Sequence, residues 1–194
     1  MTAIASLCVF CGSRKGSEEA YTDAAERLGR LLAERGVRLV YGGGGIGLMG
    51  VLSEAAMAGG GEVVGVIPDF LMKYEVGNPD ISEMIVVQSM HERKRRMFEL
   101  ADGFAVLPGG LGTLDEMFEV LTWKQLQQHA KPVVVVDAGG YWEVLKGLID
   151  ALVEGGFAHP AVRQLFTVVN DVDDVFDALA LAPEPNVEVL TSHF

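Results

Sequence analysis

One segment decides the fold of this chain: Leu107-Pro108-Gly109-Gly110-Leu111-Gly112-Thr113-Leu114-Asp115-Glu116. An apolar run of strand length, 103–107, leads into it. After it, apolar residues recur at helical spacing: Met117, Phe118, Val120, Leu121, Trp123 and Leu126. The glycines therefore predict a tight turn that carries the chain from a buried strand directly into a helix.

Such a turn suits an anionic ligand. The first N–H groups of a helix have no intrahelical acceptor, and the helix dipole is positive there, so phosphate is a natural partner. Gly109, Gly110 and Gly112 would let a ligand approach the backbone closely, and Thr113 adds a hydroxyl. The Glu116 carboxylate is expected to face water, a ribose hydroxyl or a base. The alternative is a purely structural turn whose acidic residue complements the helix dipole.

Composition limits the classes of function. The 194 residues suffice for one domain, with 49% hydrophobic and 22% charged residues, a globular balance. The net charge of −12 argues against general nucleic-acid binding, but a local positive pocket for a small phosphate compound stays open. The sequence has no membrane-spanning run, and residues 1–4 lack the basic start of a signal peptide, so we expect a cytoplasmic protein and no membrane partner.

A strand, a glycine turn and a helix alternate along the whole chain. This rhythm predicts an α/β fold, a doubly wound, Rossmann-like parallel sheet with ligands at the carboxyl ends of its strands. A single domain over residues 1–182 and a peripheral tail over 183–194 are expected. The expected strands are 4–10, 37–41, 62–67, 84–87, 103–107, 133–136 and 166–169. The main expected helices are 17–35, about 47–58, 113–128, 141–153 and 172–181, with a loop over 68–80.

Cys8 and Cys11 form a C-x-x-C pattern, which in some proteins is a redox pair. Redox pairs usually begin a helix, where the dipole lowers the thiol pKa, whereas these residues lie in or just after an apolar strand. Two buried thiols that pack as small hydrophobic groups are therefore expected. No His or Cys cluster with metal-ligand spacing follows, and we expect no metal site.

A second glycine run contains Gly45-x-Gly47-x-x-Gly50, which matches the dinucleotide fingerprint, with Asp69 further along the chain. The match follows the second expected strand instead of the first, and four consecutive glycines make a chance match easy. We therefore do not favour NAD binding.

The only dense basic cluster lies within Met90-His91-Glu92-Arg93-Lys94-Arg95-Arg96-Met97. On a helix these charges point in different directions, so one or two of them would reach a ligand while the rest face water. A guanidinium has donors that fit a phosphate or a purine edge. A solvated helix face is the alternative.

Seven segments, spread over about residues 4–157, together form a recognisable pattern. They are Cys11-Gly12-Ser13, Tyr41-Gly42-Gly43-Gly44, Gly47-Leu48-Met49-Gly50, Met90-His91-Glu92-Arg93-Lys94, Pro108-Gly109-Gly110-Leu111-Gly112-Thr113 with Glu116, Leu121-Thr122-Trp123 and Lys131-Pro132-Val133. In order and spacing these segments resemble the LOG family of cytokinin riboside 5′-monophosphate phosphoribohydrolases, long mislabelled as lysine decarboxylases.

The resemblance implies two catalytic residues, Glu116 and Arg93. It also implies a nucleotide site lined by Glu75, Arg93, Lys94, Gly110, Leu111, Gly112, Thr113, Leu114, Asp115, Glu116 and Thr122. Asp115 departs from the family, since many members carry a second Glu there. Family members are typically dimers, some larger, with the site near a subunit interface, so a homodimer or higher homo-oligomer is implied.

We therefore expect an enzyme that hydrolyses the N-glycosidic bond of an N6-modified adenosine 5′-monophosphate, with AMP as a further substrate. It would release the free base and ribose 5-phosphate without a cofactor. One alternative is a non-catalytic carrier of a nucleotide or phosphorylated cofactor on the same fold. The other is lysine decarboxylation, which ordinarily needs pyridoxal phosphate on a lysine, and no lysine here lies in a setting that suggests a Schiff base.

Overall fold

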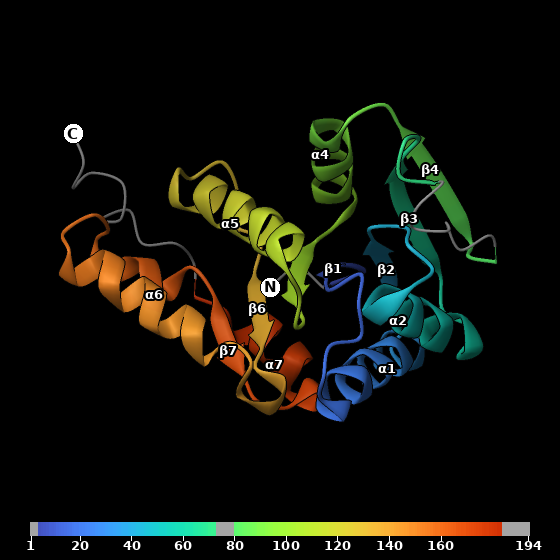
Figure 1. The fold of residues 1–194 in the computed structure, drawn as a ribbon, viewed down its shortest axis with the longest axis horizontal. Helices are drawn as coiled ribbons and strands as arrows, with labels where there is room; N and C mark the ends of the chain where they lie inside the picture. The colour runs from blue at the N-terminus through green and yellow to red at the C-terminus, as the bar shows by residue number, and fades with distance from the viewer. Residues whose placement is uncertain (1–3, 73–79, 184–194) are drawn as a thin grey trace.

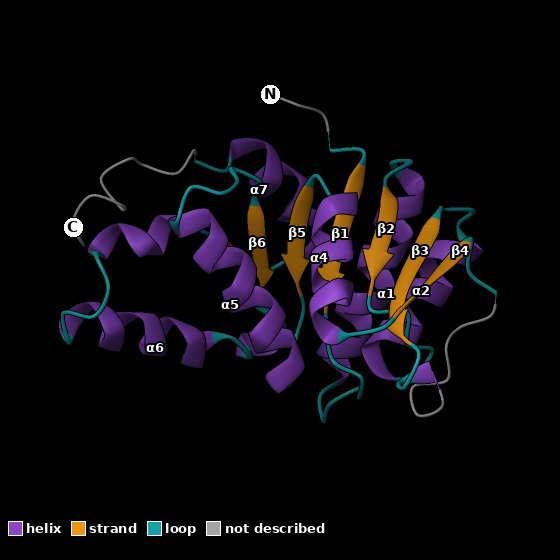
Figure 2. Cartoon of the chain, turned by 90° about the horizontal axis from the view of Figure 1, so that it is seen from above, coloured by secondary structure: helices purple, strands orange, loops and turns teal. Residues whose placement is uncertain are grey.

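Seven parallel strands form the centre of the protein in the computed structural model, which describes residues 4–72 and 80–183. The strands are β1 (Ser6–Phe10), β2 (Arg38–Tyr41), β3 (Val63–Pro68), β4 (Glu83–Val87), β5 (Gly103–Val106), β6 (Val133–Val136) and β7 (Thr167–Val169). They lie in the order β4-β3-β2-β1-β5-β6-β7, and every neighbouring pair is parallel. Figure 2 shows the six strands from β4 to β6 side by side. The strand order reverses direction between β1 and β5. The predicted doubly wound α/β fold is therefore confirmed.

Helices cover both faces of this sheet (Figure 1). They are α1 (Glu19–Glu34), α2 (Gly47–Ala58), α4 (Met90–Leu100), α5 (Leu111–Gln125), α6 (Glu143–Glu154) and α7 (Val175–Leu181), with short 3₁₀ turns η1 (Ala138–Gly140), η2 (Pro160–Gln164) and η3 (Val172–Asp174). One core cluster joins α1, α2 and α7 to the sheet, and the other joins α4, α5 and α6 to its opposite face.

The central strand shows why the sequence reads as an unbroken apolar run. Leu7 and Val9 of β1 enter the core beneath α1 and α2, whereas Cys8 and Phe10 enter the core beneath α4 and α5. Since successive side chains of a strand point to opposite faces, a strand with helices on both sides must be apolar throughout. All five residues of β1 are buried.

Element boundaries differ from the sequence expectation by a few residues. Helix α5 begins at Leu111, at the glycine turn itself, and ends at Gln125. Helix α6 begins at Glu143 instead of Tyr141, because Gly139 and Gly140 have φ values of +63° and +75° that turn the chain first. The expected closing helix divides into η3 and α7. No described helix is long and apolar enough to cross a membrane.

Candidate functional site

Three loops meet at the carboxyl edge of the sheet, after β1, β2 and β5. The Gly12 N–H donates to the Pro108 carbonyl at 3.0 Å, and the Leu48 N–H donates to the Gly12 carbonyl at 3.0 Å. These bonds join the loop after β1 to both neighbouring loops, next to the reversal in strand order. A pocket of about 180 Å³ opens there, lined by Val9, Cys11, Gly12, Ser13, Gly42, Met49, Arg93, Gly110, Leu111, Gly112, Thr113 and Glu116. The switch point of a doubly wound sheet is the usual ligand position.

The glycine turn presents an open backbone to this pocket. Gly110 caps α5 in an extended conformation, and a Cβ added at Gly110 or Gly112 would meet no atom within 4 Å. Gly109 was expected to allow close approach of a ligand, but its missing Cβ makes room for Thr113 instead. A Cβ at Gly109 would lie 2.1 Å from Oγ1 of Thr113. The space at Gly109 is therefore filled by a buried side chain, and the approach to the helix N-terminus lies at Gly110 and Gly112.

Arg93 is the member of the basic cluster that enters the pocket lining. Its side chain is buried, and its Nε and one Nη donate to the carbonyls of Val66 (3.1 Å) and Gly42 (3.0 Å). A Cβ at Gly42 would lie 2.0 Å from that Nη, so only glycine leaves room for the guanidinium. Two backbone carbonyls, one just after β2 and one within β3, thus hold a positive charge in a fixed orientation.

Glu116 lies one turn into α5 and is 9% exposed. Its negative charge and the positive charge of Arg93 both act on the Cys11 thiol. Burial is the main cause that raises the pKa of Cys11, the Glu116 charge raises it further, and the Arg93 charge opposes both. The pocket therefore brings a carboxylate and a guanidinium to the same buried thiol, although their parent residues lie on different helices.

Other residues expected at the site lie outside this pocket lining. The Lys94 ammonium is paired with Asp115 and Glu119, each at 3.1 Å. Burial, the largest single effect, lowers the pKa of Lys94, but the hydrogen bonds and charges of these two carboxylates together raise it above its usual value. Thr122 donates from its hydroxyl to the Phe118 carbonyl at 2.7 Å. Leu114 is half-buried on α5. Glu75 lies outside the described residues.

Sequence reasoning did not assign several pocket residues to the site. Cys8 and Cys11 are both buried with free thiols, as expected, but Cys11 also lines the pocket. Gly42, Ser13 and Met49 line it as well. Their position in the sequence could have assigned Cys11 and Gly42 to the pocket. Both directly follow predicted strands, and ligands of such sheets bind at the carboxyl ends of the strands.

The glycines that match the dinucleotide fingerprint serve close packing between loops. Gly47 has a φ of +64°, and a Cβ there would lie 2.2 Å from the backbone of Ser13. A Cβ at Gly50 would lie 2.5 Å from the Gly45 carbonyl oxygen. Close backbone contacts therefore explain this pattern.

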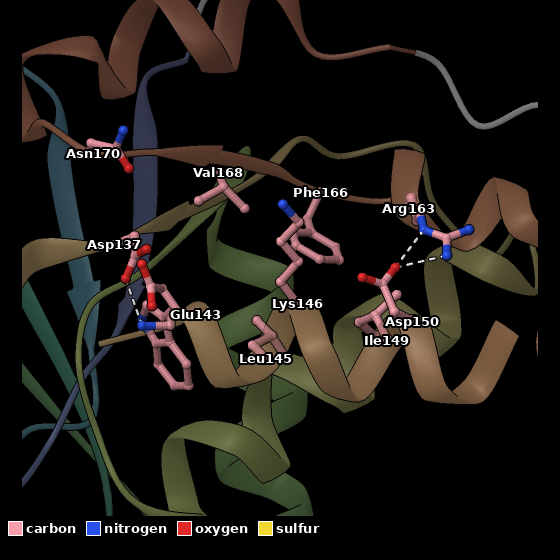
Figure 3. Close-up of a pocket in the computed structure, with 11 residues that line it drawn as sticks. Asp137, Glu143, Leu145, Lys146, Ile149, Asp150, Arg163, Phe166, Val168 and Asn170 are labelled. Atoms are coloured by element: carbon pink, nitrogen blue, oxygen red, sulfur yellow. Dashed lines mark hydrogen bonds and ion pairs between the residues drawn. The ribbon is translucent and has the colours of Figure 1, made fainter. Parts of the chain in front are cut away.

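A larger cavity of about 510 Å³ lies between α6 and β7 and shares no lining residue with the pocket at the switch point (Figure 3). The cavity contains the Arg163 guanidinium, which is paired with Asp150 at 2.7 Å, and it is lined by Leu145 on the α6 side and by Phe166 on the β7 side (Figure 3). The smaller pocket differs from this cavity because it combines an open helix N-terminus with a buried carboxylate and a buried guanidinium.

Fold and site together define a Rossmann-like α/β protein with a pocket at the topological switch point, where such folds usually bind their ligands. The family model described as "Possible lysine decarboxylase" matches residues 49–179. Cytokinin riboside 5′-monophosphate phosphoribohydrolase LOG7 of Arabidopsis thaliana is 44% identical over 186 residues, which cover 96% of this chain and 85% of that protein. LOG1 of the same plant, with the same enzyme name, is 48% identical over 159 residues, which cover 82% and 75%. The chain therefore belongs to the LOG family.

Solved structures agree on the architecture. The molybdenum cofactor binding protein of Rippkaea orientalis is similar with a TM-score of 0.69 over 93% of this chain and 98% of that one. Its sequence is 20% identical, so the likeness shows the fold alone.

Proposed function

We propose that the protein hydrolyses the N-glycosidic bond of cytokinin riboside 5′-monophosphates, releasing the free base and ribose 5-phosphate. One observation carries the proposal: a single pocket combines the open N-terminus of α5, the Glu116 carboxylate and the Arg93 guanidinium. Family membership supports it, since the relatives named above carry this enzyme name. N6-modified adenine nucleotides are the proposed substrates, with AMP as a further one.

Glu116 is the proposed catalytic carboxylate. When the base leaves C1′, the sugar develops positive charge, and a nearby anion stabilises that transition state. The same carboxylate orients a water molecule and accepts its proton as the water oxygen bonds to C1′. The bond between C1′ and the base nitrogen breaks as the base takes up a proton from solvent, and Glu116 then returns the proton of the attacking water to solvent. A buried carboxylate on the first turns of a helix is held in place for this task.

Arg93 and the glycine turn are the proposed nucleotide anchors. The backbone N–H groups from Gly110 to Thr113 receive the 5′-phosphate at the positive end of the α5 dipole. Arg93, fixed by two carbonyls, offsets negative charge on the phosphate or the departing base. Phosphate and sugar would thereby be fixed relative to Glu116.

The remaining proposed substrate-binding residues are Glu75, Lys94, Leu114, Asp115 and Thr122. Of these, Lys94 and Asp115 form an ion pair between α4 and α5, beside the first turns of α5. We propose that this pair borders the nucleotide at the first turns of α5.

We also propose a homo-oligomer, with a dimer as the smallest form. Its support is an apolar row on α6, in which Val144, Leu148 and Leu152 are 76%, 47% and 36% exposed. Residues four apart lie on one helix face, so this row forms a continuous apolar surface. A cytoplasmic location is proposed as well, and the two free cysteines are compatible with a reducing compartment.

The test is base release, measured by chromatography with isopentenyladenosine monophosphate, AMP, GMP and CMP. We expect free isopentenyladenine together with ribose 5-phosphate, and loss of this activity in Glu116→Gln with the circular dichroism spectrum retained. Near-wild-type turnover in Glu116→Gln would refute the assigned carboxylate. Saturable nucleotide binding without any released base would instead indicate the carrier alternative.

A further inference from the structure

A phenol on the loop after β6 is bonded to the glycine turn after β5. The Tyr141 hydroxyl donates to the Gly109 carbonyl at 2.5 Å across 32 residues of sequence. Gly109 immediately precedes Gly110, which caps α5 and lines the pocket. The bond therefore holds the Gly109–Gly110 peptide unit, which lies at the start of the proposed phosphate site.

A hydrogen bond to the carbonyl of a peptide unit also affects the N–H group of that unit. A trans peptide is planar, and its C=O and N–H point in opposite directions. A hydrogen bond that holds the Gly109 carbonyl therefore also fixes the direction of the Gly110 N–H. Between two glycines this peptide has little steric resistance to rotation, because neither residue has a Cβ that limits its φ and ψ angles. The Gly110 N–H donates to no other described residue.

The position of the phenol is itself well supported. The Tyr141 ring meets the edges of Tyr21 and Trp142 at centroid distances of 5.3 and 4.8 Å. The backbone N–H of Trp142 donates to the Asp137 carboxylate at 2.5 Å, which closes the turn that carries Tyr141. Two ring contacts and a closed turn thus hold the hydroxyl against the Gly109 carbonyl.

We propose that Tyr141 is a positioning residue that orients the Gly109–Gly110 peptide, so that the Gly110 N–H faces the substrate phosphate. The inference rests on the proposed function, because it takes the N-terminus of α5 as the phosphate site. Tyr141 acts through the backbone and does not touch the reacting atoms. Its removal should weaken the binding of the phosphate end of the nucleotide and leave the base end unaffected.

The test compares Tyr141→Phe with Tyr21→Phe in direct binding of ribose 5-phosphate and of adenine by calorimetry. Both variants keep their aromatic rings, but only Tyr141→Phe loses the bond to Gly109. For Tyr141→Phe we expect the dissociation constant of ribose 5-phosphate to rise about fivefold to tenfold, the magnitude of one lost hydrogen bond. Adenine affinity should be unchanged, and Tyr21→Phe should match the wild type for both compounds.

Equal ribose 5-phosphate affinity in Tyr141→Phe and the wild type would overturn the inference, as would an equal loss of affinity for adenine. A wild type that does not bind ribose 5-phosphate would overturn it too. Failure of the proposed function is a separate result, since a protein that binds ribose 5-phosphate but releases no base would still show whether Tyr141 orients the turn. KM for the nucleotide should rise in Tyr141→Phe in proportion to the weakened binding.

Discussion

Lys124 is a buried lysine whose cost to stability can be estimated from its burial. It lies in the last turn of α5, is 1% exposed, and forms no ion pair with a carboxylate of the described chain. Burial disfavours its charged form and lowers the pKa of Lys124 from 10.5 to about 8. The folded protein therefore carries an ammonium that would be better solvated in the unfolded chain.

The sign of the pH dependence follows from this pKa. Between pH 8 and 10.5 the unfolded chain holds the Lys124 proton more tightly than the folded protein, so stability rises with pH through that window. Below it both states are protonated, and the folded state bears the full cost. The fall in pKa corresponds to about 3 kcal/mol, an upper magnitude because structural relaxation reduces it.

Lys124→Met keeps an unbranched side chain of similar volume and removes the charge. We expect its free energy of unfolding at pH 7 to exceed that of the wild type by about 1–3 kcal/mol, and the difference to shrink as pH approaches 10.5. Urea denaturation followed by circular dichroism at several pH values measures both quantities. The exposed Lys146→Met is the matched control, expected to change stability by about 0.5 kcal/mol or less. A difference between wild type and Lys124→Met that is constant from pH 7 to 10.5 would refute the reasoning.

Three further substitutions test the site and the sheet. Gly42→Ala would place a Cβ 2.0 Å from the Arg93 guanidinium. We expect the rate of base release to fall about a hundredfold because Arg93 is displaced. Unchanged activity would contradict the role of Arg93 as a nucleotide anchor. Gly110→Ala adds a methyl group where no atom lies within 4 Å, so the free energy of unfolding measured by urea titration should change by about 0.5 kcal/mol or less. Steady-state kinetics should show a raised KM. A large loss of stability with a normal KM would be evidence against an open turn. The Asp102 carboxylate accepts from the backbone N–H groups of Ala5 and Ser6 at 2.9 and 3.0 Å, and Asp102→Ala should lower the unfolding free energy by about 1–3 kcal/mol with normal turnover. Unaltered stability there would show that water replaces the carboxylate without cost.

Local pattern determined much of this protein. Apolar runs and the glycines between them predicted all seven strands and the main helices, because strand and helix periodicity depend only on residues close together in the sequence. The turn at Gly110 and the carboxylate of Glu116 belong to one segment, so their place at the start of α5 was readable as well. The expected burial of Cys8 and Cys11 followed from the same apolar strand.

Tertiary structure alone decided which loops share the pocket. Cys11 and Gly42 meet the α5 turn because β1 lies between β2 and β5, and strand order is set by packing across the whole sheet. The basic cluster did not reveal which cation would be buried, since Arg93 is held by carbonyls from two distant strands while Lys94 pairs with Asp115. The sequence thus determined the elements and the turn through contacts between neighbours. Contacts between residues far apart in the chain decided the surroundings of each charge.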